Sequence, residues 1–447
     1  MTDPDAFNAS SDSGAQRRSS NELSEGKAIK PPLLVYLALR KVPWSPAYIG
    51  FLCFVVAAIT YIVDMGTAAM AVALVALFTS SRRMRWPLPV WLFLIFWIWA
   101  ALATALSDFS GDAEALIELG KVFLVFLVAV NVLWDRFALR LFLLIYLACF
   151  ALFPARGTLF NYFIYDNADF GRPSWIKLFG NANDMAGLTI LALALAAGFL
   201  HKETPRAVRF AALLLCLVFP FIVLLTQSRG AFIGMCVFLL LTVTTIGRNR
   251  IRFMLIISVL AAAVIAAAPP AVWERISGLQ DATSSDSIAE MDGSAVERWE
   301  IAQTAFRIIE DHPFVGVGRG RAQTVHGIYN PKIGPKSLHN TYLEVFVETG
   351  ALGLILFLWH LILQLVRARR ARGKAVAICD SADWRRLQLL EFGLWGYLVA
   401  GIWGSYGFLS MLYIYLAIIF AQTEALDTIA QEASAVPNRS NQIEAKA

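Results

Sequence analysis

Long runs of apolar residues, separated by short charged or Pro/Gly-rich breaks, constrain this chain more than any other feature. An α-helix needs about 20 mainly apolar residues to cross a membrane, and about twelve segments approach that length. They are residues 46–63, 66–79, 88–106, 115–133, 137–154, 184–200, 208–226, 230–247, 252–269, 341–366, 387–403 and 406–422. The second segment is short for a bilayer. The pattern predicts an all-α polytopic membrane protein.

The composition agrees with this fold class. Hydrophobic residues make up 58% of the 447 residues and charged residues only 16%, which is too apolar for a soluble domain. The five cysteines are scattered and show neither a disulfide framework nor metal-ligand spacing. The net charge of +5 is best explained by basic loops between spans, so we expect no nucleic-acid binding.

Lysine and arginine are concentrated in alternate loops, which the positive-inside rule assigns to the cytoplasm. Arg82, Arg83 and Arg85 lie in one such loop, and residues 367–386 form the most basic one. The intervening loops contain few basic residues, so we expect both termini in the cytoplasm and residues 155–183 and 270–340 outside.

The expected organisation therefore has five parts. They are a disordered cytoplasmic tail and membrane approach (1–45), nine spans (46–269), an outer loop (270–340), three spans (341–422) and a cytoplasmic tail (423–447).

The outer loop 270–340 is too long to be a simple connector. Ser294 and Glu297 have capping-box spacing, which predicts a helix that ends before His312-Pro313. The apolar stripe of this helix is expected to contain Val296, Trp299, Ala302, Phe306 and Ile309. The glycine-rich segment 314–321 follows no predicted strand and precedes no Gly-Lys-Ser/Thr, so we expect a tight turn packed on the membrane and not a nucleotide site.

A histidine lies where the outer loop meets the next apolar run. Thr341 and Glu344 have capping-box spacing, which predicts a helix that begins just after His339. His339 and Asn340 would then lie at a helix N-terminus, where free N–H groups and the helix dipole favour an anion. The alternative is a histidine that anchors the helix among lipid head groups.

Two arginines at the outer face are binding candidates. Arg229 lies in a polar break, residues 227–230, between two apolar runs, where an arginine is costly and often functional. The alternative is a side chain that extends to the lipid head groups. Arg298 is expected in the first turn of the loop helix, where a cation opposes the dipole; an ion pair with Glu297 or Asp292 would also explain it.

Other polar residues at this face are possible supporting residues, namely Ser228, Arg319, Arg321, Asn181 and Asn183. Helix capping would explain the asparagines without any chemistry, and a solvated turn would explain the two further arginines. Arginine binds phosphate oxygens in bidentate fashion, and a neutral histidine can accept a proton. Together the set suits a polyanionic leaving group and a hydroxyl nucleophile, with no metal or other cofactor.

In this setting the motif His339-Asn340, followed after nine residues by Gly350-Ala-Leu-Gly353, resembles the signature of the O-antigen ligase and polymerase superfamily. Four other segments resemble the family in the same order, namely Asn181-Ala-Asn-Asp-Met-Ala186, Ser228-Arg229-Gly230, Glu297-Arg298-Trp299 and His312-Pro313-Phe-Val-Gly316-Val-Gly318. The likeness covers residues 180–365. Ile233 stands where the ligase pattern has leucine, so ligase and polymerase both remain open.

The resemblance implies a glycosyltransferase of the bacterial inner membrane with a periplasmic active site. Its donor would be a glycan on undecaprenyl pyrophosphate, and its acceptor lipid A–core, another lipid-linked repeat in a polymerase, or a protein side chain. Arg229 and Arg298 would bind the pyrophosphate, and His339 would accept the acceptor's proton in a metal-independent, inverting displacement. A transporter is the alternative outside the family, because broken helices and intramembrane arginines also occur there.

Overall fold

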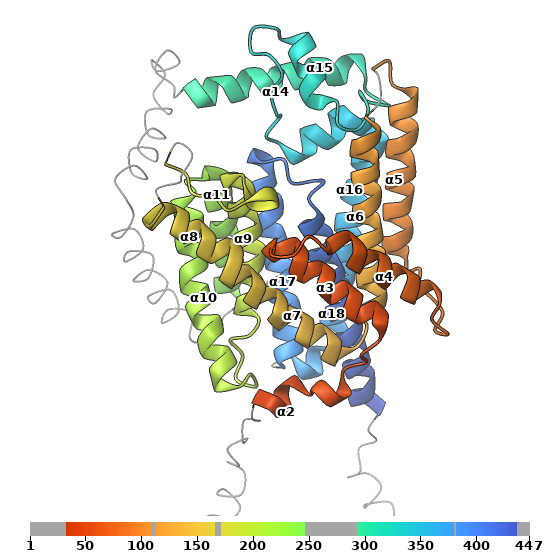
Figure 1. Cartoon of the computed structure of the whole chain (residues 1–447), viewed down its shortest axis with the longest axis vertical. Helices are drawn as coiled ribbons and strands as arrows, with labels where there is room; N and C mark the ends of the chain where they lie inside the picture. Colours follow the sequence, from red (N-terminus) through yellow and green to blue (C-terminus); the bar gives the residue numbers. More distant parts are fainter. Residues whose placement is uncertain (1–32, 110–111, 166–170, 246–292, 380, 436–447) are drawn as a thin grey trace, which may run out of the picture.

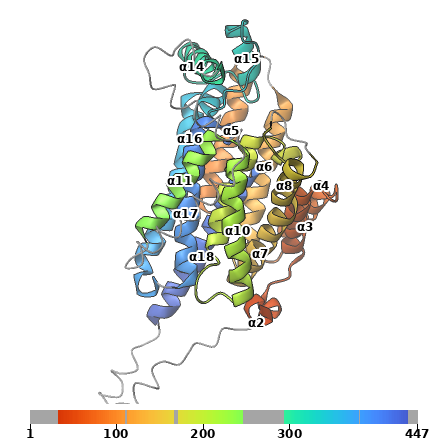
Figure 2. The ribbon, with the colours of Figure 1, turned by 90° about the vertical axis from the view of Figure 1, so that its left-hand side faces the viewer.

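The computed structural model describes residues 33–109, 112–165, 171–245, 293–379 and 381–435. Within these ranges the chain is helical and contains no strand, which confirms the expected all-α architecture for this part of the chain. Figures 1 and 2 show α14 and α15 at one end of a helical bundle, and α2 and the C-terminal end of α18 at the other.

Residues 246–292 lie outside the described ranges. The helices before them are α2 (Leu33–Leu37), α3 (Pro46–Thr60), α4 (Gly66–Phe78), α5 (Leu88–Leu106), α6 (Ala113–Val132), α7 (Arg136–Phe150), α8 (Arg156–Phe163), α9 (Ala182–Ala197), α10 (Arg206–Leu225) and α11 (Arg229–Thr244). Those after them are α14 (Gly293–Asp311), α15 (Ala322–Tyr329), α16 (Thr341–Lys374), α17 (Ala382–Ala400) and α18 (Ser410–Ala435). Each expected span within the described ranges contains a helix; the expected span 230–247 extends two residues beyond these ranges, and 252–269 lies outside them.

Six helical segments of the described chain are long and apolar enough to cross a membrane. They are α5, α6, the continuous run from α7 to α8, α10, α16 and α18. The helices α3, α4, α9 and α11 are apolar but shorter, with 13 to 16 residues each. The described part is therefore a polytopic membrane bundle with fewer full-length spans than the twelve expected.

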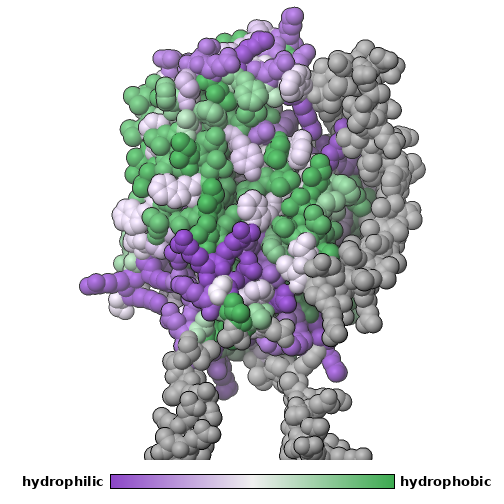
Figure 3. Space-filling model, turned by 180° about the vertical axis from the view of Figure 1, so that it is seen from behind, coloured by the Kyte–Doolittle hydropathy of each residue, from purple (hydrophilic) through white to green (hydrophobic). Residues whose placement is uncertain are grey.

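Hydropathy is layered along the bundle. Figure 3 shows a broad hydrophobic band between hydrophilic ends, the pattern of a protein whose flanks contact lipid. The apolar window of α18 is 78% buried by other helices, whereas that of α10 is only 33% buried. Hence α18 lies near the centre of the bundle and α10 at its margin.

One span ends later than the sequence indicates. It was expected to end at residue 154, but α7 continues through a π-helical turn (η2, Ala151–Ala155) into α8, which ends at Phe163. Pro154 lies in this turn. Proline lacks the N–H of an α-helical hydrogen bond and its ring crowds the preceding turn; the wider π turn accommodates it without ending the helix.

The crossing of α11 and α17 depends on two glycines. A Cβ on Gly234 would lie 2.2 Å from the carbonyl oxygen of Gly396, and a Cβ on Gly396 would lie 2.6 Å from that of Gly234. Only residues without a side chain permit backbones to approach this closely. The crossing holds α11, and the polar break that precedes it, against α17.

The apolar stripe expected on α14 is wrong at two of its positions, whereas Ile309 does pack against the core of this helix. Trp299 and Phe306 are 62% and 53% exposed, whereas Ile301, Ala305 and Ile308 are buried. The buried residues pack against Val317 and Val325 in a second, smaller core. This packing selects the face at positions 301, 305 and 308, which the sequence alone does not distinguish from its neighbour. Because α14 begins at Gly293, Arg298 lies in its second turn and not, as expected, in its first.

The glycine-rich turn after α14 packs its backbone on α16. Gly316, Gly318 and Gly320 all have positive φ angles. The N–H groups of Val317 and Gly318 donate to the carbonyls of Val347 and Glu348, at 2.8 and 3.1 Å. The turn expected from the sequence therefore forms, and it contacts a helix directly.

That contact is possible because α16 is broken at Gly350, where φ is 66° and ψ is −173°. The sequence predicts an unbroken helix here. At the break the N–H of Ala351 donates to the carbonyl of Pro313, at 2.9 Å. The interruption exposes backbone groups of α16, and the preceding turn satisfies them.

Ion pairs join the helices at the end of the bundle where α2 lies. Glu391 of α17 is fully buried and accepts from Arg369 at 2.8 Å and from Arg372. Glu424 of α18 accepts from Arg367 at 2.7 Å and also pairs with Arg85. Several arginines that mark basic loops in the sequence thus fix α16, α17 and α18 to one another.

Candidate active site

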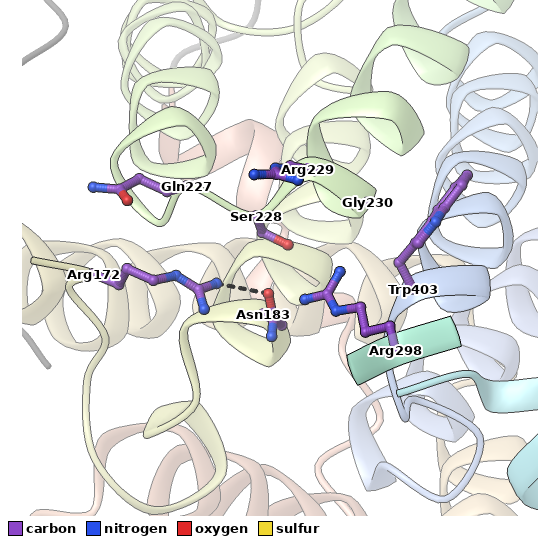
Figure 4. A pocket seen from close by; sticks show the side chains of 8 residues that line it. All are labelled: Arg172, Asn183, Gln227, Ser228, Arg229, Gly230, Arg298 and Trp403. Atoms are coloured by element: carbon purple, nitrogen blue, oxygen red, sulfur yellow. Dashed lines mark hydrogen bonds between the residues drawn. The ribbon is translucent and has the colours of Figure 1, made fainter. Parts of the chain in front are cut away.

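Three arginines from distant parts of the chain line one pocket near α14. Arg172 comes from the segment before α9, Arg229 begins α11, and Arg298 extends from the inward face of α14. Figure 4 shows Arg172 and Arg298 pointing toward Asn183 from opposite sides, with Arg229 beside Ser228. The complete lining is Arg172, Asn183, Gln227, Ser228, Arg229, Gly230, Arg298 and Trp403. The structure thus brings together Arg229 and Arg298, the two expected arginines.

The pocket is narrow. Its volume of about 10 Å³ corresponds to about one water molecule. None of the eight lining residues carries a carboxylate. A larger anion would therefore bind at the mouth, or would spread the long arginine side chains apart.

The break between α10 and α11 places Arg229 in the pocket. α10 ends at Leu225, Gln227 adopts a left-handed conformation with φ of 52°, and Ser228 is the N-cap residue of α11. A non-glycine residue with positive φ is strained, and such strain is concentrated at functional sites. Arg229 is thus a cation at the positive end of a helix dipole, a position that favours an anion nearby.

Gly230 allows the last connection of the bundle to approach this break. A Cβ at Gly230 would lie 2.6 Å from Cβ of Trp403. Trp403 belongs to the short 3₁₀ turn η6 (Gly401–Trp403) after α17. The pocket is therefore completed by a residue that follows α17 and lies far from Arg229 in the sequence.

Arg172 is a pocket residue that the sequence reasoning missed. Its Nε donates to the carbonyl of Thr226 at 2.9 Å, and its Nη2 donates to Oδ1 of Asn183 at 2.7 Å. These two bonds fix the guanidinium across the ends of α10 and α9. The available signal was a basic residue in an outer loop that is otherwise poor in lysine and arginine.

The two asparagines before α9 differ in role. Asn181 is the N-cap residue of α9 and accepts from the N–H of Asn183 at 2.8 Å, so the expected capping is confirmed for it. Asn183 is buried and lines the pocket. It therefore orients Arg172 in addition to beginning the helix.

His339 lies beside the pocket but is not one of its lining residues. Its φ of 48° lies in the left-handed region. After Gln227, His339 is thus a second non-glycine residue with a strained backbone at this end of the bundle. Burial lowers the pKa of His339, and Arg298 and Arg172 lower it further, while Glu297 opposes them. The imidazole is accordingly neutral near pH 7 and has a nitrogen able to accept a proton.

The helix after His339 begins where expected, but its cap is different. Asn340 is the N-cap residue, and its Oδ1 accepts from the N–H groups of Tyr342 and Leu343, at 2.9 and 3.0 Å. Thr341, expected to cap the helix with Glu344, is instead the first helical residue. Its hydroxyl donates to the carbonyl of Gly404 at 2.7 Å. The hydroxyl of Thr341 therefore bonds to a residue distant in the sequence and does not form the expected local capping box.

A buried tyrosine links α16 to the arginine pocket, and it too was missed. Tyr406 is 1% exposed. Its hydroxyl donates to the carbonyl of Asn183 at 2.8 Å, and its N–H donates to the hydroxyl of Thr341, also at 2.8 Å. A Cβ on Gly187 or Gly404 would lie 3.0 or 2.3 Å from its ring. A tyrosine in an apolar stretch gives no signal of this role in the sequence.

Arg319 and Arg321 are placed apart from the pocket. Arg319 donates to Glu348 at 2.6 Å, and its guanidinium lies 3.6 Å from the ring centre of Phe408. Arg319 therefore ties the glycine-rich turn to α16 and to the connection that precedes α18. Neither it nor Arg321 is among the residues that line the arginine pocket.

No group of three His, Cys, Asp or Glu side chains suited to a metal ion occurs within the described ranges. The charged groups at the pocket are guanidinium groups, which bind oxyanions and not metal ions. The arrangement can therefore bind a phosphate-bearing group through arginine and transfer a proton to a histidine.

Residues 211–358 match the family model described as O-antigen ligase. This segment is therefore similar to the O-antigen ligase family. The O-antigen ligase segment covers about a third of the chain and includes Arg229, Arg298 and His339, but neither Arg172 nor Tyr406. The match confirms the resemblance to the ligase and polymerase superfamily, and that family implies a glycosyltransferase-like enzyme. No curated protein matches the chain significantly.

Proposed function

We propose that the chain transfers a glycan from undecaprenyl pyrophosphate to a hydroxyl of lipid A–core at the periplasmic face of the inner membrane. The observation that carries this proposal is the meeting of Arg172, Arg229 and Arg298 in one pocket beside His339. Three guanidinium groups with no carboxylate in the lining suit the pyrophosphate of a lipid-linked donor.

In this mechanism the arginines bind the pyrophosphate and stabilise the negative charge that develops as it leaves. His339 accepts the proton of the acceptor hydroxyl, and the hydroxyl oxygen forms a bond to the anomeric carbon of the glycan. The bond from that carbon to the phosphate oxygen breaks, and its electron pair leaves with undecaprenyl pyrophosphate. Attack opposite the leaving group inverts the anomeric configuration. The lowered pKa of His339 keeps the imidazole in the form that accepts a proton.

The same chemistry would serve a repeat-unit polymerase or a protein O-glycan ligase, because only the acceptor differs. It fits a transporter less well, since the three arginines gather at one end of the bundle. We also propose that α14 and α15 lie in the periplasm and that both termini lie in the cytoplasm, in agreement with the basic loops.

The test uses purified full-length protein with an undecaprenyl-pyrophosphate-linked glycan and lipid A–core, and measures the initial rate of transfer. Arg229→Lys keeps the charge but loses the bidentate fork, so we expect a rate lower by about 10²-fold, the size of effect of one lost charge-stabilising donor. Arg206→Lys, an exposed change at the far end of α10, should leave the rate unchanged.

The reaction products distinguish the members of the family. Transfer of long chains to lipid A–core indicates a ligase, lengthening of the lipid-linked chain indicates a polymerase, and glycosylated protein indicates a protein O-glycan ligase. Activity that is lost in EDTA and restored by a divalent ion would reject the metal-independent mechanism. Wild-type activity in Arg229→Lys would reject the pyrophosphate site.

A further inference from the structure

A second polar cavity lies at the opposite end of the bundle from the arginine pocket. It has a volume of about 380 Å³ and is enclosed by the start of α3, the ends of α4 and α6, and the loops that follow α4 and α6. Arg82, Arg83, Ser80 and Asn131 contribute its polar lining, and Trp134 forms part of the wall. The cavity lies at the end of the bundle where α2 is found.

Arg82 and Arg83 give this cavity its positive charge. The Arg82 guanidinium lies 3.5 Å from the ring centre of Trp134, a cation–π contact that orients it. Among the described residues, neither arginine side chain has a hydrogen-bond or ion-pair partner, whereas nearby Arg85 is paired with Glu424. Asp135 is close enough to Arg82 to interact with it electrostatically, but its carboxylate caps α7.

An apolar groove adjoins the polar cavity. It has a volume of about 680 Å³, runs between α3 and α4, and shares Pro46 with the cavity. Ile49 and Val72 in its wall are 45% and 55% exposed. The 15 residues of α3 form a helix about 22 Å long at 1.5 Å per residue. This length exceeds the roughly 15 Å hydrocarbon depth of one leaflet, so acyl chains of one leaflet fit along α3.

We propose that the cavity and the groove together bind one anionic phospholipid, with its phosphate on Arg82 and Arg83 and its acyl chains between α3 and α4. The joined shape fits an amphiphile with a negative head. Free phosphate would use only the cavity, and a zwitterionic lipid would lack the net negative charge that two unpaired arginines attract. The site lies away from the arginine pocket, so it does not depend on the proposed transfer reaction.

The experiment measures phospholipid binding to detergent-purified, full-length protein by native mass spectrometry. Phosphatidylglycerol and phosphatidylcholine with the same acyl chains are titrated separately. We expect phosphatidylglycerol to bind the wild type more tightly, and Arg82→Gln/Arg83→Gln to weaken it about ten-fold or more, because each surface arginine contributes roughly a factor of five. Arg82→Lys/Arg83→Lys should keep most of the binding.

Matched changes separate this site from a general effect of charge. Arg206→Gln/Arg370→Gln removes two exposed arginines elsewhere and should leave the affinity for phosphatidylglycerol unchanged. Val72→Trp, which fills the groove, should weaken it. Equal effects of the two glutamine pairs would overturn the proposal. Displacement of the lipid by millimolar inorganic phosphate, with no effect of Val72→Trp, would identify a free-phosphate site and also overturn it.

Discussion

The pKa of His339 connects one residue to the pH dependence of the whole reaction. Its lowered pKa means that the proton-accepting form is present above that pKa and is lost as the pH falls through it. Turnover should therefore rise with pH on the acidic side and then reach a plateau. Arg298→Gln removes a cation that lowers this pKa, so we expect the acidic limb to move to higher pH.

NMR titration of histidine-labelled protein measures the same shift without any turnover. The chain has five histidines, and the His339 signal is the one absent from His339→Ala. Arg206→Gln should leave its midpoint in place. An unchanged midpoint in Arg298→Gln would show that Arg298 does not act on the imidazole. In the transfer reaction, His339→Ala should lose about 10²–10⁴-fold in rate while still binding the donor.

Tyr406 offers a second test at the scale of one atom. Tyr406→Phe removes the hydroxyl that donates to the carbonyl of Asn183, and the loss of one such hydrogen bond costs about 0.5–1.5 kcal/mol. Because α9 and α16 are joined through this residue, we expect turnover to fall about ten-fold with little change in the donor concentration at half-maximal rate.

Tyr415→Phe is the matched control, since its buried hydroxyl also donates to a carbonyl, that of Leu390 at 2.9 Å, but far from the pocket. Tyr406 acts through His339 if Tyr406→Phe has little further effect in a His339→Ala background. Fully additive losses, or equal losses in the two tyrosine variants, would show that Tyr406 serves stability alone.

At the scale of elements, the break in α16 depends on a single glycine. At Gly350 a Cβ would lie 2.0 Å from the carbonyl oxygen of Phe314, and φ is 66°. Backbone with φ of 66° and ψ of −173° is essentially restricted to glycine and costs another residue about 1–3 kcal/mol, and the clash adds to this cost. Gly350→Ala should therefore lower the thermal unfolding temperature and separate the glycine-rich turn from α16.

The same helix provides the comparison. Gly373 is helical and nothing lies within 4 Å of the position of its Cβ, so Gly373→Ala should stabilise the protein by up to about 1 kcal/mol. Unfolding followed by tryptophan fluorescence in detergent measures both changes. A Gly350→Ala protein as stable as Gly373→Ala would mean that α16 can run straight through residue 350.

These elements show what the sequence could and could not predict. Apolar runs locate the helices because burial in lipid requires them, and Arg229, Arg298 and His339 are conspicuous because polar groups beside such runs are costly. Arg172 and Tyr406 could not be found in this way. Thr226 lies 54 residues from Arg172, and Asn183 and Thr341 lie 223 and 65 residues from Tyr406, so only packing brings these partners together. The break at Gly350 escaped notice because a glycine in an apolar run usually indicates close helix packing.

At the scale of the whole molecule, the arginine pocket and the phospholipid cavity lie at opposite ends of the bundle, so the proposed orientation is open to direct test. Single cysteines at Gln323 in α15 and at Arg370 in α16, both exposed, are introduced into a chain without its five native cysteines. In intact spheroplasts a membrane-impermeant thiol reagent should label position 323 and not position 370. Both should react after lysis. The opposite labelling pattern would invert the orientation of every span.

The pocket draws on residues 172, 229, 298 and 403, and this order has a consequence for biosynthesis. Ribosomes extend a chain at about 5–20 residues per second, so tens of seconds separate the synthesis of Arg172 from that of Trp403. Until η6 is made, the nascent protein carries the arginines synthesised so far without a finished pocket. A chain that stops between His339 and η6 contains every candidate catalytic residue and still lacks Trp403, which completes the pocket wall. Synthesis of η6 is thus the step at which every lining residue of the pocket is first present.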